Sequence, residues 1–113
     1  MSKVQVGGTS FTIILEDSIR DVSLEDGASL RLGEIRYKEK EIAIYNSPDD
    51  GEFNISIYHE LTHAIVNAHH IRSIREKDGS HDEDSVDRFA MGLQEALSSL
   101  GINIRHFIKE ELK

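Results

Sequence analysis

The sequence predicts a single α+β domain spanning residues 1–113. Up to about residue 46, apolar and polar residues alternate between turns, as they do in short strands. Residues 52–100 instead carry apolar side chains at helical spacing, in two segments separated by a charged stretch. A chain of this length supports one hydrophobic core without disulfides. We therefore expect a small N-terminal antiparallel sheet packed on two main helices.

The first expected strands flank a pair of glycines. The segments 4–6 and 11–15 are rich in β-branched residues, and Gly7-Gly8 between them predicts a tight turn. Residues 16–32 are polar and mixed in character. They predict irregular structure with at most one helical turn.

A second pair of strands is expected before the helices. The segments 34–37 and 41–45 lie on either side of Lys38-Glu39-Lys40, which predicts a hairpin. Residues 46–51 are a cluster of turn residues that includes Pro48, the single proline of the chain. This cluster predicts the boundary between sheet and helix.

Two amphipathic helices are expected in the second half. The first runs from about residue 52 to 70, and the second from about 82 to 100, where Gly101 ends it. Residues 72–80 between them are charged and predict a loop. The segment 102–113 is compatible with a short strand or a short helix.

Composition excludes several classes of function. The chain has 13 Lys and Arg against 21 Asp and Glu, a net charge of −8, which argues against binding to nucleic-acid phosphates. Without cysteine there are no disulfides, thiolate metal sites or cysteine nucleophiles. No apolar run approaches the roughly 18 residues of a membrane span. The N-terminus lacks an apolar signal region, so we expect a cytoplasmic protein without a membrane partner.

One motif within the first expected helix carries chemistry. His59-Glu60-Leu61-Thr62-His63 is an H-E-x-x-H sequence. Residues four apart lie on one face of a helix, so both imidazoles reach one point and suit a Zn²⁺ ion. Glu60 lies about 100° around the helix, where it can act as general base on a zinc-bound water. On an ordinary helix the same residues are two surface histidines and a solvated glutamate.

Catalytic zinc needs a third protein ligand, and two residues compete for that role. His69 has the spacing of H-E-x-x-H-x-x-G-x-x-H, but Val66 replaces the glycine, so the helix continues and His69 points elsewhere. Glu83 borders the apolar stripe of the second helix, which delivers it to the histidines if the helices pack together. It also fits a capping box with Ser80. Asp87, on the same face as Glu83, is expected to accept a hydrogen bond from a ligand histidine.

These residues resemble the gluzincins, the thermolysin-like zinc metallopeptidases, through H-E-x-x-H and the E-x-x-x-D string that begins at Glu83. The segments 58–65 and 86–93 are most similar to small ImmA/IrrE-type metallopeptidases, including minimal forms from phages and prophages. The chain is also similar in size to the minigluzincins. The resemblance covers about residues 34–98.

The resemblance implies a zincin-like fold and a zinc-dependent peptidase that hydrolyses peptide bonds in a peptide or protein. It implies that His59, His63 and Glu83 are the zinc ligands. Glu60 is then the general base, and Asp87 orients a ligand histidine.

In such folds an edge strand pairs with extended substrate backbone. We expect Glu41–Tyr45 to be that strand, with Ile42 and Ile44 contacting the substrate. The chain is expected to bind its substrate beside the metal, and the sequence makes no prediction of its oligomeric state.

Larger gluzincins have a further C-terminal domain that stabilises the transition state, and this chain is too short for one. His81, His106, Tyr58 and Tyr45 are candidates for that role, and the segment 104–107 is a candidate cover for the site. The alternative function is a catalytically silent zinc-binding module that holds a regulatory protein. Two histidines and a glutamate favour zinc, although related first-row metals bind such sites.

Overall fold

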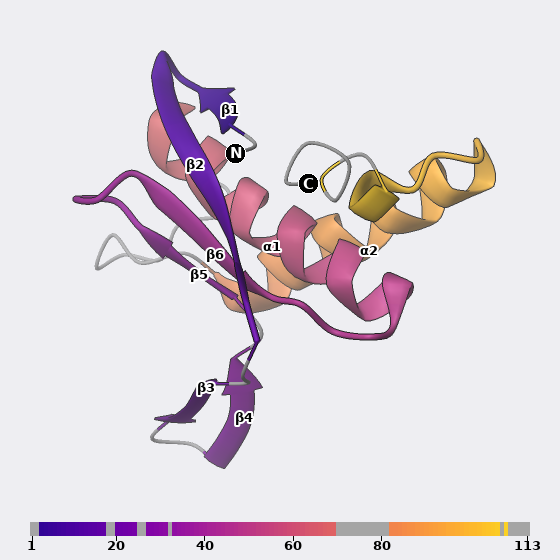
Figure 1. Ribbon diagram of the computed structural model, residues 1–113, viewed down its shortest axis with the longest axis horizontal. Helices are drawn as coiled ribbons and strands as arrows, with labels where there is room; N and C mark the ends of the chain where they lie inside the picture. Colours follow the sequence, from indigo (N-terminus) through magenta and orange to yellow (C-terminus); the bar gives the residue numbers. More distant parts are fainter. Residues whose placement is uncertain are drawn as a thin grey trace.

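A computed structural model of the chain describes residues 3–17, 20–24, 27–31, 33–69, 82–106 and 108. It contains a four-stranded sheet, a separate two-stranded sheet and two long helices (Figure 1), so the predicted α+β class is confirmed. In chain order the elements are β1 (Lys3–Val6), β2 (Thr9–Glu16), β3 (Arg20–Leu24), β4 (Gly27–Arg31), β5 (Gly33–Arg36), β6 (Glu41–Tyr45), α1 (Asp50–His69) and α2 (Glu83–Ser99).

The main sheet is mixed, so the prediction of a purely antiparallel sheet is wrong. Its strand order is β1-β2-β6-β5, and β2 runs parallel to β6, with Thr12 opposite Glu41. The pairs β1–β2 and β5–β6 are antiparallel, as expected for hairpins. The apolar strand β6 takes the interior position, whereas β5 carries Gly33, Glu34 and Arg36 and suits an edge.

The turn between β1 and β2 confirms the role predicted for the two glycines. Gly7 has φ of +58° and Gly8 has φ of +83°, the left-handed conformation that a two-residue hairpin turn requires. The turn also lies close to the end of α1. A Cβ atom added to Gly7 would lie 2.5 Å from the Cβ of Ala68, so this position leaves no room for a side chain.

Residues 16–32 contain two strands, where the sequence predicted irregular structure. β3 and β4 pair with each other in an antiparallel hairpin that extends away from the main sheet (Figure 1). The dipeptide Asp26-Gly27, a pair typical of hairpins, joins the last residue between the strands to the first residue of β4. The high content of charged residues in this segment concealed that signal.

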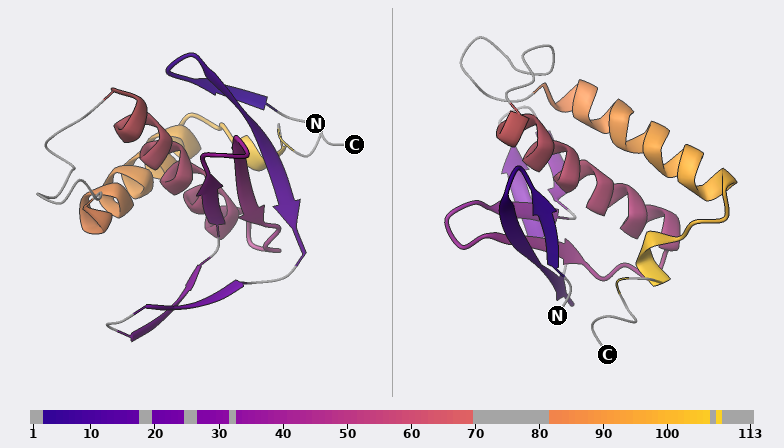
Figure 2. Two further views of the ribbon diagram at one scale, coloured as in Figure 1. Left: turned by 90° about the vertical axis from the view of Figure 1, so that its left-hand side faces the viewer. Right: turned by 90° about the horizontal axis from the view of Figure 1, so that it is seen from above.

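The three main parts of the molecule form successive layers, with α1 between the four-stranded sheet and α2 (Figure 2). Ile42 and Ile44 of β6 and Phe53 and Ile57 of α1 are all fully buried in the core between sheet and helix. α2 packs chiefly on α1. In the described part of the chain the sheet therefore contacts chiefly α1, and α2 joins the same core from the other side of α1.

The face of the sheet away from α1 carries a charged cluster. The guanidinium of Arg36 lies 2.6 Å from Glu16, 2.8 Å from Glu34 and 3.2 Å from Glu41. Hydrogen bonding to Glu34, and then to Glu16 and Glu41, raises the pKa of Arg36 despite partial desolvation. One arginine thus links β2, β5 and β6.

The helix ends follow their local sequence. The carboxylate of Asp49 accepts a hydrogen bond from the backbone N–H of Glu52 and caps α1. Asp82 caps the start of α2, and its carboxylate accepts from the backbone N–H of Asp84. Gly101, which has φ of +79°, follows the C-terminal cap of the helix at Leu100. The two helices match their predicted spans to within two residues, and the predicted loop at 72–80 lies outside the described residues. No described helix is long and apolar enough to cross a membrane.

The segment after α2 anchors to the start of α1. Residues 104–106 are helical, which resolves the choice between strand and helix for this part of the chain. Arg105 is buried, and its guanidinium donates to Asp50 at 3.0 Å. Asn54 donates to the side chain of Asn103 at 2.9 Å and accepts from the backbone N–H of Arg105 at 3.1 Å. We call these four residues the C-terminal anchor.

The anchor predicts a specific loss of stability in acid. The hydrogen bond from Asn103 holds the pKa of Asp50 below its usual value, with help from Arg105 and against some desolvation. The pKa of Asp50 is lower in the folded chain than in the unfolded chain, so the ionised carboxylate stabilises the fold at pH values above the unfolded pKa. This stabilisation is lost as the pH falls through the folded pKa. Urea unfolding of Asp50→Asn should therefore depend less on pH below about pH 4 than the wild type does. The exposed control is Glu95→Gln. If the free energy of unfolding of Asp50→Asn changed with pH as steeply as that of Glu95→Gln, this prediction would be contradicted.

Candidate metal centre

α1 presents two imidazoles to one point. His59 and His63 lie one helical turn apart, and their Nε2 atoms are 3.1 Å from each other. The ring centroids are 4.8 Å apart with an interplanar angle of 65°. Both rings are mostly buried, with side-chain exposures of 21% and 14%. The predicted convergence of the H-E-x-x-H histidines is therefore present.

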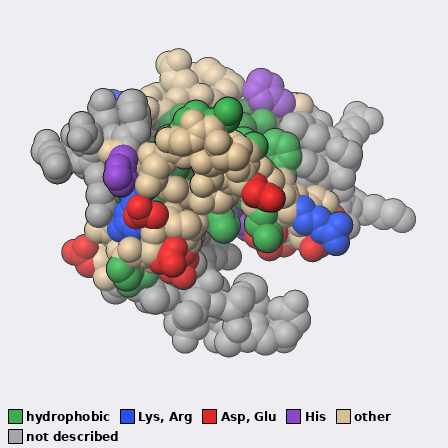
Figure 3. Space-filling model, turned by 90° about the vertical axis from the view of Figure 1, so that its right-hand side faces the viewer, with side chains coloured by type: hydrophobic (Ala, Val, Ile, Leu, Met, Phe, Trp, Pro, Cys, Tyr) green, Lys and Arg blue, Asp and Glu red, His purple; other side chains and the backbone are tan. Residues whose placement is uncertain are grey.

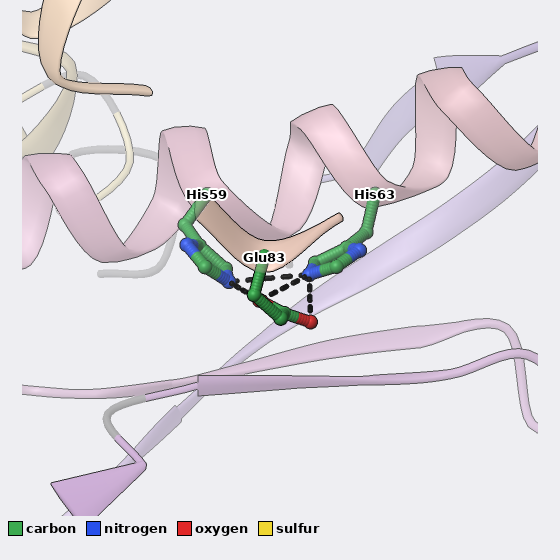
Figure 4. A group of neighbouring side chains, drawn as sticks. All are labelled: His59, His63 and Glu83. Atoms are coloured by element: carbon green, nitrogen blue, oxygen red, sulfur yellow. Dashed lines mark hydrogen bonds and ion pairs between the residues drawn. The ribbon is translucent and has the colours of Figure 1, made fainter. Parts of the chain in front are cut away.

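Glu83 brings a carboxylate from α2 to the same point. Its Oε2 atom lies 3.2 Å from Nε2 of His59, and its Oε1 atom lies 3.1 Å from Nε2 of His63 (Figure 4). Val86 and Ala90 on the next turns of α2 are fully buried and dock this helix on α1. Glu83 is the first residue of α2, and Asp82 is the N-cap. Ser80, the expected partner in a capping box, lies outside the described residues.

Asp87 lies on the far side of the first imidazole. Nδ1 of His59 donates to its carboxylate at 2.6 Å, which is the contact predicted from the spacing of Glu83 and Asp87. A neutral His59 with its proton on Nδ1 carries a lone pair on Nε2. When both ring nitrogens carry a proton, Nε2 instead donates to the carboxylate of Glu83 at 3.2 Å.

This donor set fits a small cation. Among the described residues, His59, His63 and Glu83 are the one group of potential metal ligands that converges, each offering one ligand atom. Tetrahedral zinc with bonds of about 2.0–2.1 Å places neighbouring ligand atoms about 3.3 Å apart, and the contacts here measure 3.1–3.3 Å. Two imidazoles and one carboxylate leave the fourth position of such an ion open.

The electrostatics of the site favour positive charge. Hydrogen bonding to His59, and then to His63, holds the pKa of Glu83 far below its usual value, although desolvation opposes this. For His59, the largest single effect is desolvation, which lowers its pKa. The carboxylates of Glu83, Glu60 and Asp87 together outweigh it and raise the pKa of His59 above its ordinary value.

Glu60 lies between α1 and the edge strand β5. Its residue exposure is 8%, and a Cβ atom built on Gly33 would lie 3.2 Å from its Cγ. Gly33 thus provides the space that the Glu60 side chain occupies beside the histidines. Gly33 was not among the residues predicted from the sequence, although a glycine within a strand is a known sign of close approach by another element.

Filling that space is expected to be costly. In Gly33→Ala the new Cβ would lie 2.8 Å from the side chain of Ile44 and 3.1 Å from the backbone oxygen of Ala43. Because backbone cannot move aside easily, we expect a loss of about 1–3 kcal/mol in the free energy of unfolding. The control is Gly92→Ala in α2, where the added Cβ meets nothing within 4 Å and helix propensity predicts a gain of about 1 kcal/mol. Equal effects of the two variants in chemical denaturation would contradict the assigned role of Gly33.

β5, not β6, is the edge strand beside these residues. β6 lies between β2 and β5, and both Ile42 and Ile44 are 0% exposed, so the prediction that they contact substrate from an edge strand is wrong. β5 runs along the histidine segment of α1. Gly33 approaches Glu60 at one end, and just past the other end the Tyr37 hydroxyl donates to the carbonyl of His63 at 3.4 Å.

The remaining candidate residues lie elsewhere. His69 is exposed at the end of α1 and does not join the convergent group. Tyr58 is buried in the core, and Tyr45 alternates with Ile44 and so lies on the sheet face away from α1. His106 lies 3.8 Å from Asp50 at the start of α1, so residues 104–106 contact that end of the helix and do not cover the histidines. His81 lies outside the described residues.

Comparisons with protein-family models, with curated proteins and with solved structures find no match for this chain. The geometry of the site is therefore the basis for assigning its function.

Proposed function

We propose that the chain is a zinc-dependent peptidase of minimal zincin-like architecture. The observation that carries the proposal is the convergence of His59, His63 and Glu83, with a buried carboxylate on the adjacent position of α1. Zn²⁺ would be held by these three side chains. When bound, it supplies a Lewis acid that polarises a carbonyl and lowers the pKa of water.

The side chains of this protein take the remaining roles. Glu60 accepts a proton from the attacking water and delivers it to the departing amine. Asp87 keeps the proton of His59 on Nδ1, so that Nε2 faces the ion. The open edge of β5 pairs with an extended stretch of peptide or protein substrate, because it runs beside the histidine segment of α1.

Two measurements on the purified full-length chain test this function. Isothermal titration with Zn²⁺ should give one tight site per chain, and the loaded protein should cleave an unstructured protein such as denatured casein. The matched control is His59→Ala/His63→Ala, which should do neither. A wild-type chain that binds no zinc, or a double variant that still binds it equally well, would overturn the proposed site.

The alternative function is a zinc-binding module that does not turn over its bound partner. One observation favours it: among the described residues, the predicted transition-state donors Tyr45, Tyr58 and His106 all lie away from the three ligands. The casein assay separates the two functions. Zinc binding at one site without cleavage on prolonged incubation would favour the silent module.

A further inference from the structure

Tyr37 is an exposed aromatic residue directly after β5, the strand at the edge of the main sheet. Its residue exposure is 44%, although two contacts hold the side chain in place. The ring packs edge-on against Phe11 of β2, with centroids 6.4 Å apart and an interplanar angle of 77°. The hydroxyl donates to the backbone carbonyl of His63 at 3.4 Å. Tyr37 thus presents a fixed aromatic surface beside one of the proposed metal ligands.

The side chain of Tyr37 lies on the face of the sheet that is turned toward α1. Alternate residues of a strand share a face, and the close approach of Gly33 to Glu60 places positions 33, 35 and 37 on this face. Ile35 is partly buried against the core. Of these three residues, Tyr37 alone has an exposed side chain. It is therefore the residue that a molecule lying along the edge of β5 would meet on this face.

Other exposed apolar residues lie where no strand edge is available. Figure 3 shows apolar side chains at the surface on the side of the molecule where α2 ends. The exposed large apolar residues of α2 and of the segment directly after it are Phe89, Met91, Leu100 and Ile102. A helix uses its backbone groups in its own hydrogen bonds, whereas an edge strand presents unpaired N–H and C=O groups. Among the described residues, Tyr37 is thus the exposed large apolar side chain that adjoins an edge able to pair with extended peptide.

We infer that Tyr37 selects peptides that carry an aromatic or large aliphatic side chain at one fixed position. The inference rests on the proposed pairing of the substrate with β5. A peptide that extends the sheet along β5 turns every second side chain toward α1, and side chains directly opposite each other on neighbouring strands lie about 4.5–5.5 Å apart. The peptide residue opposite Tyr37 therefore packs on its ring, where aromatic and β-branched partners pair best. Tyr37 is a specificity residue and takes no part in the chemical step.

Peptide hydroxamates test this without any cleavage, because the hydroxamate group binds zinc and so fixes the position of the peptide. The probes are two series of short alanine-based hydroxamates, one extending from the metal toward the N-terminus of the peptide and one toward its C-terminus. Phe replaces each Ala in turn, and isothermal titration gives the affinity for the zinc-loaded full-length chain. Phe should tighten binding by about fivefold or more at one position of one series, because Tyr37 lies at only one end of β5.

Variants of Tyr37 separate the packing of the ring from the role of the hydroxyl. Tyr37→Ala should reduce the preference for Phe to less than about twofold, whereas Tyr37→Phe keeps the ring and should retain the preference. The matched control is Tyr45→Ala, which removes a tyrosine from the end of β6, on the sheet face away from α1, and should leave the preference unchanged. Binding of the all-alanine probe shows whether the metal site of each variant is intact.

Each other outcome has a definite meaning. If the hydroxamates bind but Phe gives no preference, or if Tyr37→Ala retains the preference, the inference is wrong and the proposed zinc site stands. A preference lost equally in Tyr45→Ala would show that it does not arise from Tyr37. If zinc binds but no hydroxamate does, the open position on the metal is wrong and the inference fails with it. If titration detects no zinc binding, the proposed function fails together with this inference.

Discussion

Replacement of Glu60 by Gln is expected to lower kcat/KM for peptide cleavage by about 10²–10⁴-fold. Gln preserves the size and most of the packing of this side chain, whose residue exposure is 8%, but it cannot accept a proton from water. Zinc affinity should change little, because Glu60 is not among the three convergent ligand atoms. The measurement is the initial rate of cleavage by zinc-loaded protein, with the zinc content determined on the same sample.

The matched control for this variant is Glu52→Gln, an exposed glutamate in the first turn of the same helix. It removes one negative charge from α1 without altering the site and should retain the wild-type rate. Full activity in Glu60→Gln would show that the assigned general base is wrong. A proportional loss of zinc and activity would assign Glu60 a role in metal binding instead.

Removing one histidine ligand is expected to have the second large effect. Structural zinc sites bind with about 10–16 kcal/mol, so losing one of three protein ligands should weaken zinc binding by roughly a thousandfold or more. His63→Ala, whose wild-type side chain is 14% exposed beside Glu83, should therefore lose zinc in a competition titration with a chromophoric chelator. Asp87→Asn should weaken binding by only about 10–100-fold, because it disturbs the orientation of a ligand and not the ligand itself.

His69→Ala is the control for the histidine variants. The sequence offered His69 as a rival third ligand, but it is exposed at the end of α1 and lies apart from the convergent group. Its replacement should leave zinc affinity within about twofold of the wild type. A loss comparable to that of His63→Ala would show that His69, and not Glu83, completes the site.

The parts of this site that the sequence predicts are those fixed by local geometry. Spacing of four residues on a helix places His59 beside His63 and Glu83 beside Asp87, whatever the remainder of the chain does. The apolar stripe that contains Val86 and Ala90 predicts which face of α2 packs on α1. Together these patterns bring the two pairs to one point.

The arrangement of the strands depends on contacts that spacing does not specify. The parallel pairing of β2 with β6 joins residues far apart in the sequence, and it puts β5 at the edge. Ile42 and Ile44 are therefore core residues. The sequence of the hairpin at 34–45 does not by itself determine which of its two strands lies at the edge of the sheet. Gly33 and Tyr37 were missed for the same reason, since their proximity to Glu60 and His63 arises only once β5 lies along α1.

Anomalous diffraction from a zinc-soaked crystal, recorded on both sides of the zinc absorption edge, tests the convergence of His59, His63 and Glu83 most directly. The predicted result is one zinc peak per chain within about 2.0–2.2 Å of Nε2 of both histidines and a carboxylate oxygen of Glu83. A structure without zinc between the two rings, or with the carboxylate of Glu83 turned to solvent while zinc binds elsewhere, would contradict it.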